Sequence, residues 1–170
     1  MGRLTRIIGV IDKINDYAAR AVQWFVLILV VTLVYEVIMR YVFNSPTLWS
    51  FDVSYMSASI FLMLGMGYTL KEGGHVNIDI IVGNLSRRNQ AILNLIFFAI
   101  LFFPLWFSVL YAFTPNLINS WAIGETAAVG TWRPPIYPYK TWLYVGMFLL
   151  LIQGISEFLK ELLIIFRGEE

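Results

Sequence analysis

Long apolar runs alternate with short charged segments along the whole chain. The clearest run, AVQWFVLILVVTLVY, lies between Arg20 and Glu36. With its C-terminal flank it reaches the roughly 20 residues that a membrane-spanning helix needs. Three further runs follow it. The pattern predicts an all-α membrane protein, a single domain over residues 1–170 with four transmembrane helices at about residues 18–41, 53–70, 91–113 and 140–160.

The composition supports a membrane protein and excludes several other classes. Of the 170 residues, 59% are hydrophobic and 14% charged, whereas soluble domains carry about a quarter charged residues. The net charge of +1 gives no electrostatic basis for binding nucleic acid. With no cysteine and one histidine, the chain has no thiolate site and no pair of histidine haem ligands. We therefore expect no enzyme, no bound metal and no cofactor in this chain.

The distribution of basic residues predicts the orientation. Nine of the 12 Lys and Arg residues fall in the N-terminal segment, the second loop and the C-terminal tail, against three in the first and third loops. Because cytoplasmic loops are enriched in Lys and Arg, both termini should be cytoplasmic. Tryptophan and tyrosine residues in the first and third loops suit the outer membrane interface.

Two segments outside the spans also carry a pattern. Apolar residues in the first 16 positions recur at helical spacing, at Leu4, Ile7, Ile8, Ile11 and Ile14. This favours an amphipathic helix on the inner membrane surface; an extension of the first span is the alternative. Between the second and third spans, KEGGHVNIDIIVGNLSRRNQ is rich in apolar residues and predicts an interfacial segment, with Arg87 and Arg88 among lipid headgroups.

The third span contains Pro104 after a phenylalanine-rich run. Proline lacks a backbone donor and clashes with the preceding turn, so it should kink the helix there.

A glutamate and an arginine end the first span. Glu36 and Arg40 are one helical turn apart and can pair on one face. A proton or substrate site is one interpretation; an interfacial ion pair that contacts a neighbouring helix is the favoured one, because the pair lies near the outer end of the span. Asn44 and Pro46 indicate a turn, and Ser50 or Asp52 could cap the second helix.

Three segments together resemble the small membrane subunit of TRAP (tripartite ATP-independent periplasmic) transporters, of the DctQ type. They are YEVIMRYVFNSPTLWSFD, GMGYTLKEGGHVNIDI and SWAIGE followed by TWRPPIYPYKTWLYVGMFLLLIQG. The resemblance covers nearly the whole chain, and the pieces occur in the family's order. No piece is diagnostic alone.

The resemblance implies a multi-pass protein of the bacterial or archaeal cytoplasmic (inner) membrane. Such a small accessory subunit scaffolds a large elevator-type subunit, which carries the substrate and sodium sites. A periplasmic substrate-binding protein docks on the outer face. Uptake of an organic acid or related solute is then driven by an ion gradient, and the small subunit contributes no catalytic residue.

The family's motifs match this chain position by position. The first outer hairpin matches at Glu36, Arg40, Asn44, Trp49 and Asp52, with aspartate at 52 where glutamate is common. The third loop matches at Trp121, Glu125, Trp132, Pro134, Pro135 and Lys140, and Arg133 adjoins Trp132. These are candidates for partner contact or assembly. The inner motif, Gly67, Lys71, Gly74, His75 and Asp79, reads as structural; Asn77 replaces a basic residue common there.

A hypothesis from another class is a small self-assembling four-helix multidrug exporter. Such a protein needs an acid near the middle of its first span, and Glu36 lies too close to the outer end. A redox membrane anchor is weaker still, because the chain has one histidine and no cysteine.

Overall fold

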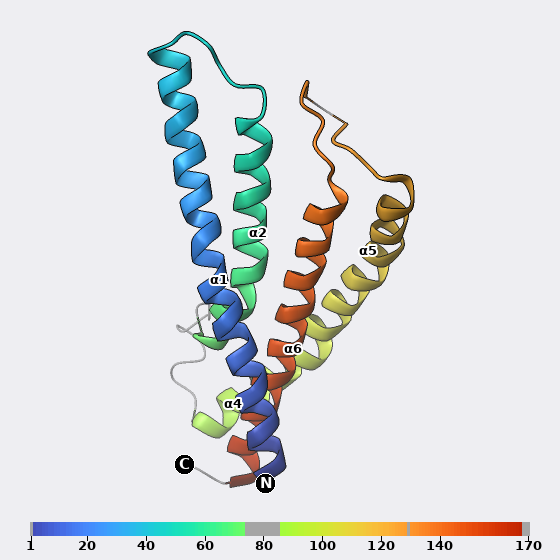
Figure 1. Ribbon diagram of the computed structural model, residues 1–170. Coiled ribbons are helices and arrows are strands. Elements are labelled where there is room, and N and C mark those ends of the chain that lie inside the picture. Colours follow the sequence, from blue (N-terminus) through green and yellow to red (C-terminus); the bar gives the residue numbers. More distant parts are fainter. Residues whose placement is uncertain (1, 74–85, 129, 168–170) are drawn as a thin grey trace.

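The computed structural model describes residues 2–73, 86–128 and 130–167. They form α1 (Gly2–Tyr41), α2 (Ser50–Lys71), α4 (Arg87–Phe97), the π-helical turn η1 (Phe98–Phe102), α5 (Phe103–Ile123) and α6 (Tyr137–Arg167). The segments α4, η1 and α5 follow one another without a break, so the described chain makes four helical rods (Figure 1). This confirms the all-α prediction. Gly74, His75 and Asp79, with most of the predicted interfacial segment, lie outside the described residues.

The N-terminal segment is not a separate surface helix. It is the first part of α1, which runs as one helix from Gly2 to Tyr41. The structure therefore replaces the favoured prediction with its alternative, an extension of the first span. The physical reason is that the polar residues of this segment bind α6 and α2, as described below, and this holds the segment against the other helices.

Three helical segments are long and apolar enough to cross a membrane: Leu4–Tyr41, Ser50–Lys71 and Arg87–Ile123. They contain the first three predicted spans. The 31-residue helix α6 contains the fourth, but it is not among the three, so the count of four spans stays a prediction.

The rods lie side by side in the order α1, α2, α6 and α5 (Figure 1). Helix α2 packs against both α1 and α6, and α5 packs on α6. One apolar cluster joins α1, α2 and α6 through Val22, Ile60, Leu64 and Leu149. A second joins η1, α5 and α6 through Phe98, Phe102, Leu110, Met147, Leu150 and Leu151. Helix α6 therefore contributes to both cores.

Glycines allow α6 to approach its neighbours closely. A Cβ atom built on Gly146 would lie 2.7 Å from the backbone carbon of Met63 in α2, and one on Gly154 would lie 2.1 Å from the ring of Phe102. A larger residue at either position would push α6 away from its neighbour, which is the usual role of small residues between membrane helices.

The sequence predicts a kink at Pro104. The structure has a π-helical turn, η1, in the turn that precedes this proline. A proline cannot donate to the carbonyl four residues before it, and the π turn Phe98–Phe102 provides the local change of hydrogen bonding. Helix α5 then continues past Pro115 to Ile123 and ends at Gly124, whose φ of 60° is left-handed. The third helix thus ends ten residues beyond the C-terminal end of the predicted span.

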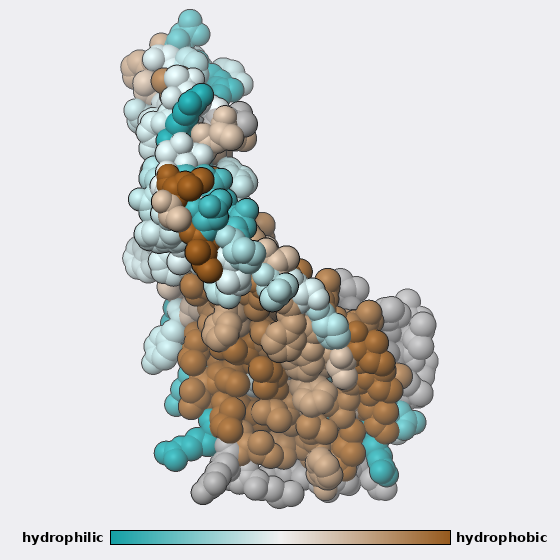
Figure 2. Space-filling view, turned by 90° about the vertical axis from the view of Figure 1, so that its right-hand side faces the viewer, coloured by the Kyte–Doolittle hydropathy of each residue, from teal (hydrophilic) through white to brown (hydrophobic). Residues whose placement is uncertain are grey.

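Much of the apolar surface is not covered by the chain itself. Only 17%, 22% and 11% of the most apolar windows of the three candidate spans are buried. Figure 2 shows a broad apolar surface on the side formed by α5. The exposed apolar residues of η1 and α5 include Ile100, Leu101, Leu105 and Phe107. Lipid or another membrane protein must cover it, because water would not.

Candidate interaction sites at the two ends of the helices

We call the end with the α1–α2 and α5–α6 connections the outer end, and the end with both termini the inner end (Figure 1). At the outer end, Glu36 holds the connection between α1 and α2. One carboxylate oxygen accepts hydrogen bonds from Arg40 Nε at 3.0 Å and Arg40 Nη2 at 2.6 Å. The other accepts from the backbone N of Thr47 at 3.1 Å and from its hydroxyl. Glu36 thereby ties the loop back to α1.

Two other predicted residues of the hairpin have local roles. The ring of Trp49 stacks on Tyr35, with centroids 5.7 Å apart. Asn44 has a φ of 50°, the left-handed conformation that asparagine tolerates in turns. The predicted turn is confirmed, while a contact of these residues with a partner stays a prediction.

The predicted cap of α2 is wrong. The helix begins at Ser50, its N-cap residue is Trp49, and no side chain caps it. Ser50 and Asp52 are instead buried inside the first turn. A Cβ built on Gly130 would lie 3.5 Å from the Asp52 carboxylate, so the first turn of α2 lies beside the α5–α6 connection.

In the connection between α5 and α6, the described residues 124–128 and 130–136 form a small hairpin that we call the outer loop. Ala127 N donates to Pro134 O and Ile136 N donates to Glu125 O, both at 2.9 Å, around an isolated bridge between Thr126 and Pro135. The outer loop is therefore a defined surface rather than a free connection.

An ion pair closes the base of the outer loop. Lys140 Nζ lies 2.5 Å from a carboxylate oxygen of Glu125 and 3.0 Å from Asn116 Oδ1. The hydrogen bond from Lys140 lowers the pKa of Glu125 below its usual value. These two predicted contact residues thus pair with each other.

The aromatic and proline residues of this region differ in their contacts. Trp121 of α5 is 55% exposed, but its indole N–H donates to Thr141 Oγ1 at 2.9 Å and its ring packs on Tyr137, with centroids 4.5 Å apart. Pro134 is buried. Trp132, Arg133 and Pro135 are exposed, and Arg133 has a φ of 46°. These three exposed residues are the part of the outer loop that a docking protein could reach.

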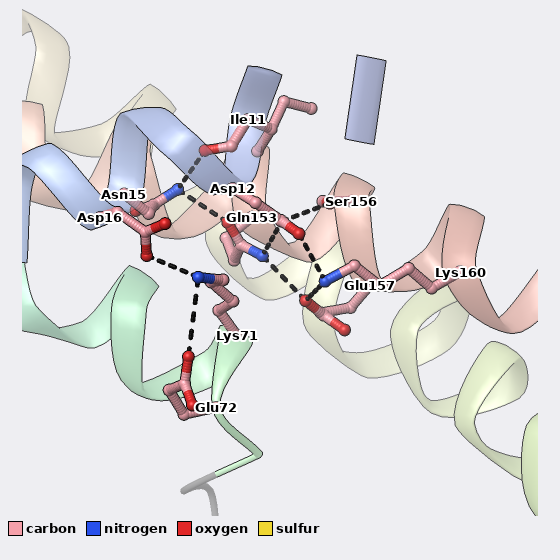
Figure 3. Close-up of polar contacts among 10 residues, drawn as sticks. All are labelled: Ile11, Asp12, Asn15, Asp16, Lys71, Glu72, Gln153, Ser156, Glu157 and Lys160. Carbon is pink, nitrogen blue, oxygen red and sulfur yellow. Dashed lines mark hydrogen bonds and ion pairs between the residues drawn. The ribbon is translucent and has the colours of Figure 1, made fainter. Parts of the chain in front are cut away.

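A buried polar cluster at the inner end joins α1 to α6 (Figure 3). Gln153 lies at its centre and is fully buried. Its amide nitrogen donates to Asp12 and to Glu157, and its oxygen accepts from Asn15, each at 2.8 Å. Lys160 pairs with Asp12 at 3.0 Å and with Glu157 at 2.7 Å, and Ser156 donates to Asp12 at 2.9 Å. We call these six residues the inner cluster.

Two residues of the predicted inner motif connect α2 to the same region. Lys71 lies 2.5 Å from Asp16 of α1. Gly67 faces Asn15, and a Cβ built there would lie 2.2 Å from the Asn15 side-chain oxygen. For Gly67 and Lys71, the structural interpretation agrees with these contacts.

The predicted headgroup residues Arg87 and Arg88 are exposed in the first turn of α4. Farther along this helix, Asn94 donates to Glu161 of α6 at 2.7 Å. The position of the two arginines is compatible with lipid headgroups, and their lipid contact stays a prediction.

Sequence reasoning missed the inner cluster. None of its six residues is among the candidate site residues that the sequence predicts. The available signal was the polar set Gln153, Ser156, Glu157 and Lys160 at spacings of three and four residues, which places them on one face of α6. The pairing of that face with α1 needed the fold.

The described residues contain no group of three or more His, Asp or Glu side chains that could hold a metal ion. At both ends, ion pairs and hydrogen bonds join neighbouring helices or tie a loop to its helix.

The family match decides between the remaining classes. Residues 27–163 match the family described as tripartite ATP-independent periplasmic transporters, DctQ component. The chain belongs to this DctQ family. No curated protein matches the chain.

Membership in the DctQ family identifies the chain as a small component of a TRAP transporter and a membrane protein. The family is a transporter component family, not an enzyme family, and the multidrug exporter gains no support from it. The match includes Glu36, the outer loop and the α6 half of the inner cluster. It begins after Asp12, Asn15 and Asp16, so the α1 half of the inner cluster is documented by the structure alone.

Proposed function

We propose that this DctQ chain is the scaffold subunit of its TRAP transporter. In this role it holds a large elevator-type membrane subunit in the bilayer and helps a periplasmic substrate-binding protein to dock. The family match carries the proposal. The apolar sides of the helices that remain exposed support it, because a stator needs membrane-embedded surface for a partner.

The proposal includes a topology. The chain crosses the inner membrane four times, with α6 as the fourth span and both termini in the cytoplasm. The excess of Lys and Arg at the inner end supports this orientation. The outer loop and the α1–α2 hairpin then face the periplasm.

In this proposal the large membrane subunit, not this chain, transports the solute and couples transport to an ion gradient. The large subunit binds the solute, an organic acid or a related compound, and is driven by an ion gradient, with sodium as the expected ion. This chain contributes no cofactor. Polar side chains join neighbouring helices in the pairs Asn15–Gln153 and Asp16–Lys71, which suits a static subunit.

The first experiment is purification of tagged chain from its native membrane in a mild detergent. We expect a larger polytopic protein to co-purify in a one-to-one ratio. A homo-oligomer with no second protein would contradict the scaffold role and revive the exporter.

Docking is tested separately by measuring how uptake depends on the concentration of the binding protein. Replacing exposed Trp132 or Arg133 with alanine should raise the concentration needed for half-maximal uptake while leaving the complex assembled. Trp24→Ala is the matched control, because Trp24 is also exposed but lies on α1. An unchanged concentration dependence in Trp132→Ala and Arg133→Ala would argue against docking at the outer loop.

A further inference from the structure

A groove of about 550 Å³ lies between α1 and α2 towards their inner ends. Its character changes along its length. Asp16, Arg20, Tyr68 and Thr69 line one end, whereas Val22, Val26 and Phe61 line the other. Since α1 and α2 are joined by a short connection and run in opposite directions, the polar lining of both helices falls at the same, inner, end.

The polar end has one uncompensated charge. The carboxylate of Asp16 is neutralised by Lys71 at 2.5 Å. Among the described residues, no carboxylate forms an ion pair with Arg20, whose guanidinium lies 5.8 Å from the centre of the Tyr17 ring. An anionic group is therefore the complementary ligand for this end.

The apolar part of the groove contains space that the chain does not use. A Cβ built on Gly65 would meet nothing within 4 Å. Glycine inside a helix costs about 1 kcal/mol relative to alanine. Unlike Gly67, Gly65 does not offset that cost with a close helix contact. The open floor at Gly65 leaves room for an apolar chain.

The dimensions match one leaflet of a bilayer. On α1 the lining extends from Asp16 to Val26, a rise of about 15 Å over ten steps of 1.5 Å. This is half of the roughly 30 Å hydrocarbon core. A ligand with an anionic head at Arg20 and an apolar chain of one leaflet's depth has the chemistry of a membrane lipid.

We propose that the groove between α1 and α2 binds one glycerophospholipid, with its phosphate at Arg20 and one acyl chain along Val22, Val26 and Phe61 over Gly65. This site is separate from Arg87 and Arg88. Lipid binding here goes beyond the scaffold role. The lipid would fill the groove between α1 and α2, which contact each other elsewhere along their lengths.

The test is a lipid titration of the delipidated complex, purified through this chain and followed by native mass spectrometry. The probes are phosphatidylglycerol with palmitoyl and oleoyl chains and the diacylglycerol with the same chains, which lacks the phosphate. We expect phosphatidylglycerol to bind at least tenfold more tightly than diacylglycerol. Arg20→Ala should remove that difference, and Gly65→Leu should weaken both lipids by filling the groove.

Lys13→Ala is the control, because Lys13 is an exposed cation on α1 outside the groove lining. Thermal unfolding checks that each variant is folded, and Arg20→Gln provides a second, polar replacement. Equal loss of lipid in Lys13→Ala and Arg20→Ala would overturn the site in favour of a diffuse charge effect. A photo-crosslinker at Gln23 should capture lipid; capture of the large subunit would show that the groove is a protein contact and overturn the proposal.

Discussion

At Gly67, a single hydrogen atom in place of a side chain lets the Asn15 side chain fit between α1 and α2. Asn15 cannot swing away easily, because it is fully buried and its amide donates to Gln153 at 2.8 Å and to Ile11 O at 3.3 Å. A methyl group at position 67 must therefore displace a hydrogen-bonded side chain or separate two helices.

We predict that Gly67→Ala destabilises the protein by about 1–3 kcal/mol, the usual cost of overpacking. The melting temperature in detergent should fall by several degrees. Gly65→Ala is the matched control: its Cβ meets nothing within 4 Å, so it should not lower the melting temperature. Equal melting temperatures for the two variants would contradict the tight contact at Gly67.

The contacts of Glu36 lead to a second prediction at this scale. Glu36→Ala removes the acceptor for the hydrogen bonds of Thr47. We predict that the backbone amides of residues 42–49 then exchange hydrogen for deuterium at least several times faster, as measured by mass spectrometry. Arg40→Ala should have a much smaller effect, because Thr47 keeps its bonds to Glu36. Similar exchange in wild type and Glu36→Ala would mean that the loop is held by other contacts, such as the Tyr35–Trp49 stack.

At the scale of the elements, polar side chains of the inner cluster hold the inner part of α1 against α6. Such groups contribute little net stability while they are paired, but each costs about 1–3 kcal/mol when its partner is removed. The inner cluster therefore fixes where α1 lies more than it adds to stability.

We predict that Gln153→Ala loosens the first turns of α1 from α6, because Asn15, Asp12 and Glu157 each lose a bond. Spin labels at exposed Val10 and Phe166, introduced as the only two cysteines, should show a broadened distance distribution. Glu161→Ala is the control on the same helix, since Glu161 bonds Asn94 of α4 instead. An unchanged distribution in Gln153→Ala would contradict the role of the inner cluster.

The ion pair between Glu125 and Lys140 makes the stability of the outer loop depend on pH. Because the pKa of Glu125 is lowered in the folded protein by Lys140, its stabilising contribution is complete above the ordinary carboxyl pKa of about 4.5 and disappears as the pH falls through the lowered value. We predict that the stability difference between wild type and Glu125→Gln is constant near neutral pH and shrinks towards zero in acid. Thermal unfolding from pH 7 to pH 3 measures it; a difference that persists in acid would exclude the ion pair as its source.

Some features of the helices could be predicted from the sequence, and others could not. Apolar runs located the long helices, because burial in lipid demands uninterrupted apolar sequence. The helix ends were less predictable: the C-terminal half of α5 holds Thr114, Pro115 and Asn116, which interrupt the apolar run without interrupting the helix. Pairings such as Glu36 with Thr47, or Gln153 with Asp12, depend on contacts across 11 and 141 positions, and single-chain periodicity carries no information about them.

For the whole molecule, the four rods form a row (Figure 1), and the side of the row formed by α5 is broadly apolar (Figure 2). In the proposed topology the outer loop is periplasmic and α4 starts in the cytoplasm. We predict that a cysteine at Thr131 reacts with a membrane-impermeant reagent in intact cells, and that one at Arg88 reacts only after permeabilisation. Labelling of Arg88→Cys in intact cells would overturn the orientation; the cysteine-free parent chain is the background control.

The contact between Gly146 and Met63 restricts how α6 can move along α2. A shift of α6 by one helical turn would bring Trp142 or Leu150 to the place of Gly146, and neither fits where a single Cβ would already lie 2.7 Å from a backbone atom. The contact therefore opposes sliding of α6 along α2 by one turn. In the proposed scaffold role, movement during a transport cycle then takes place in the partner, and this helix pair keeps its position.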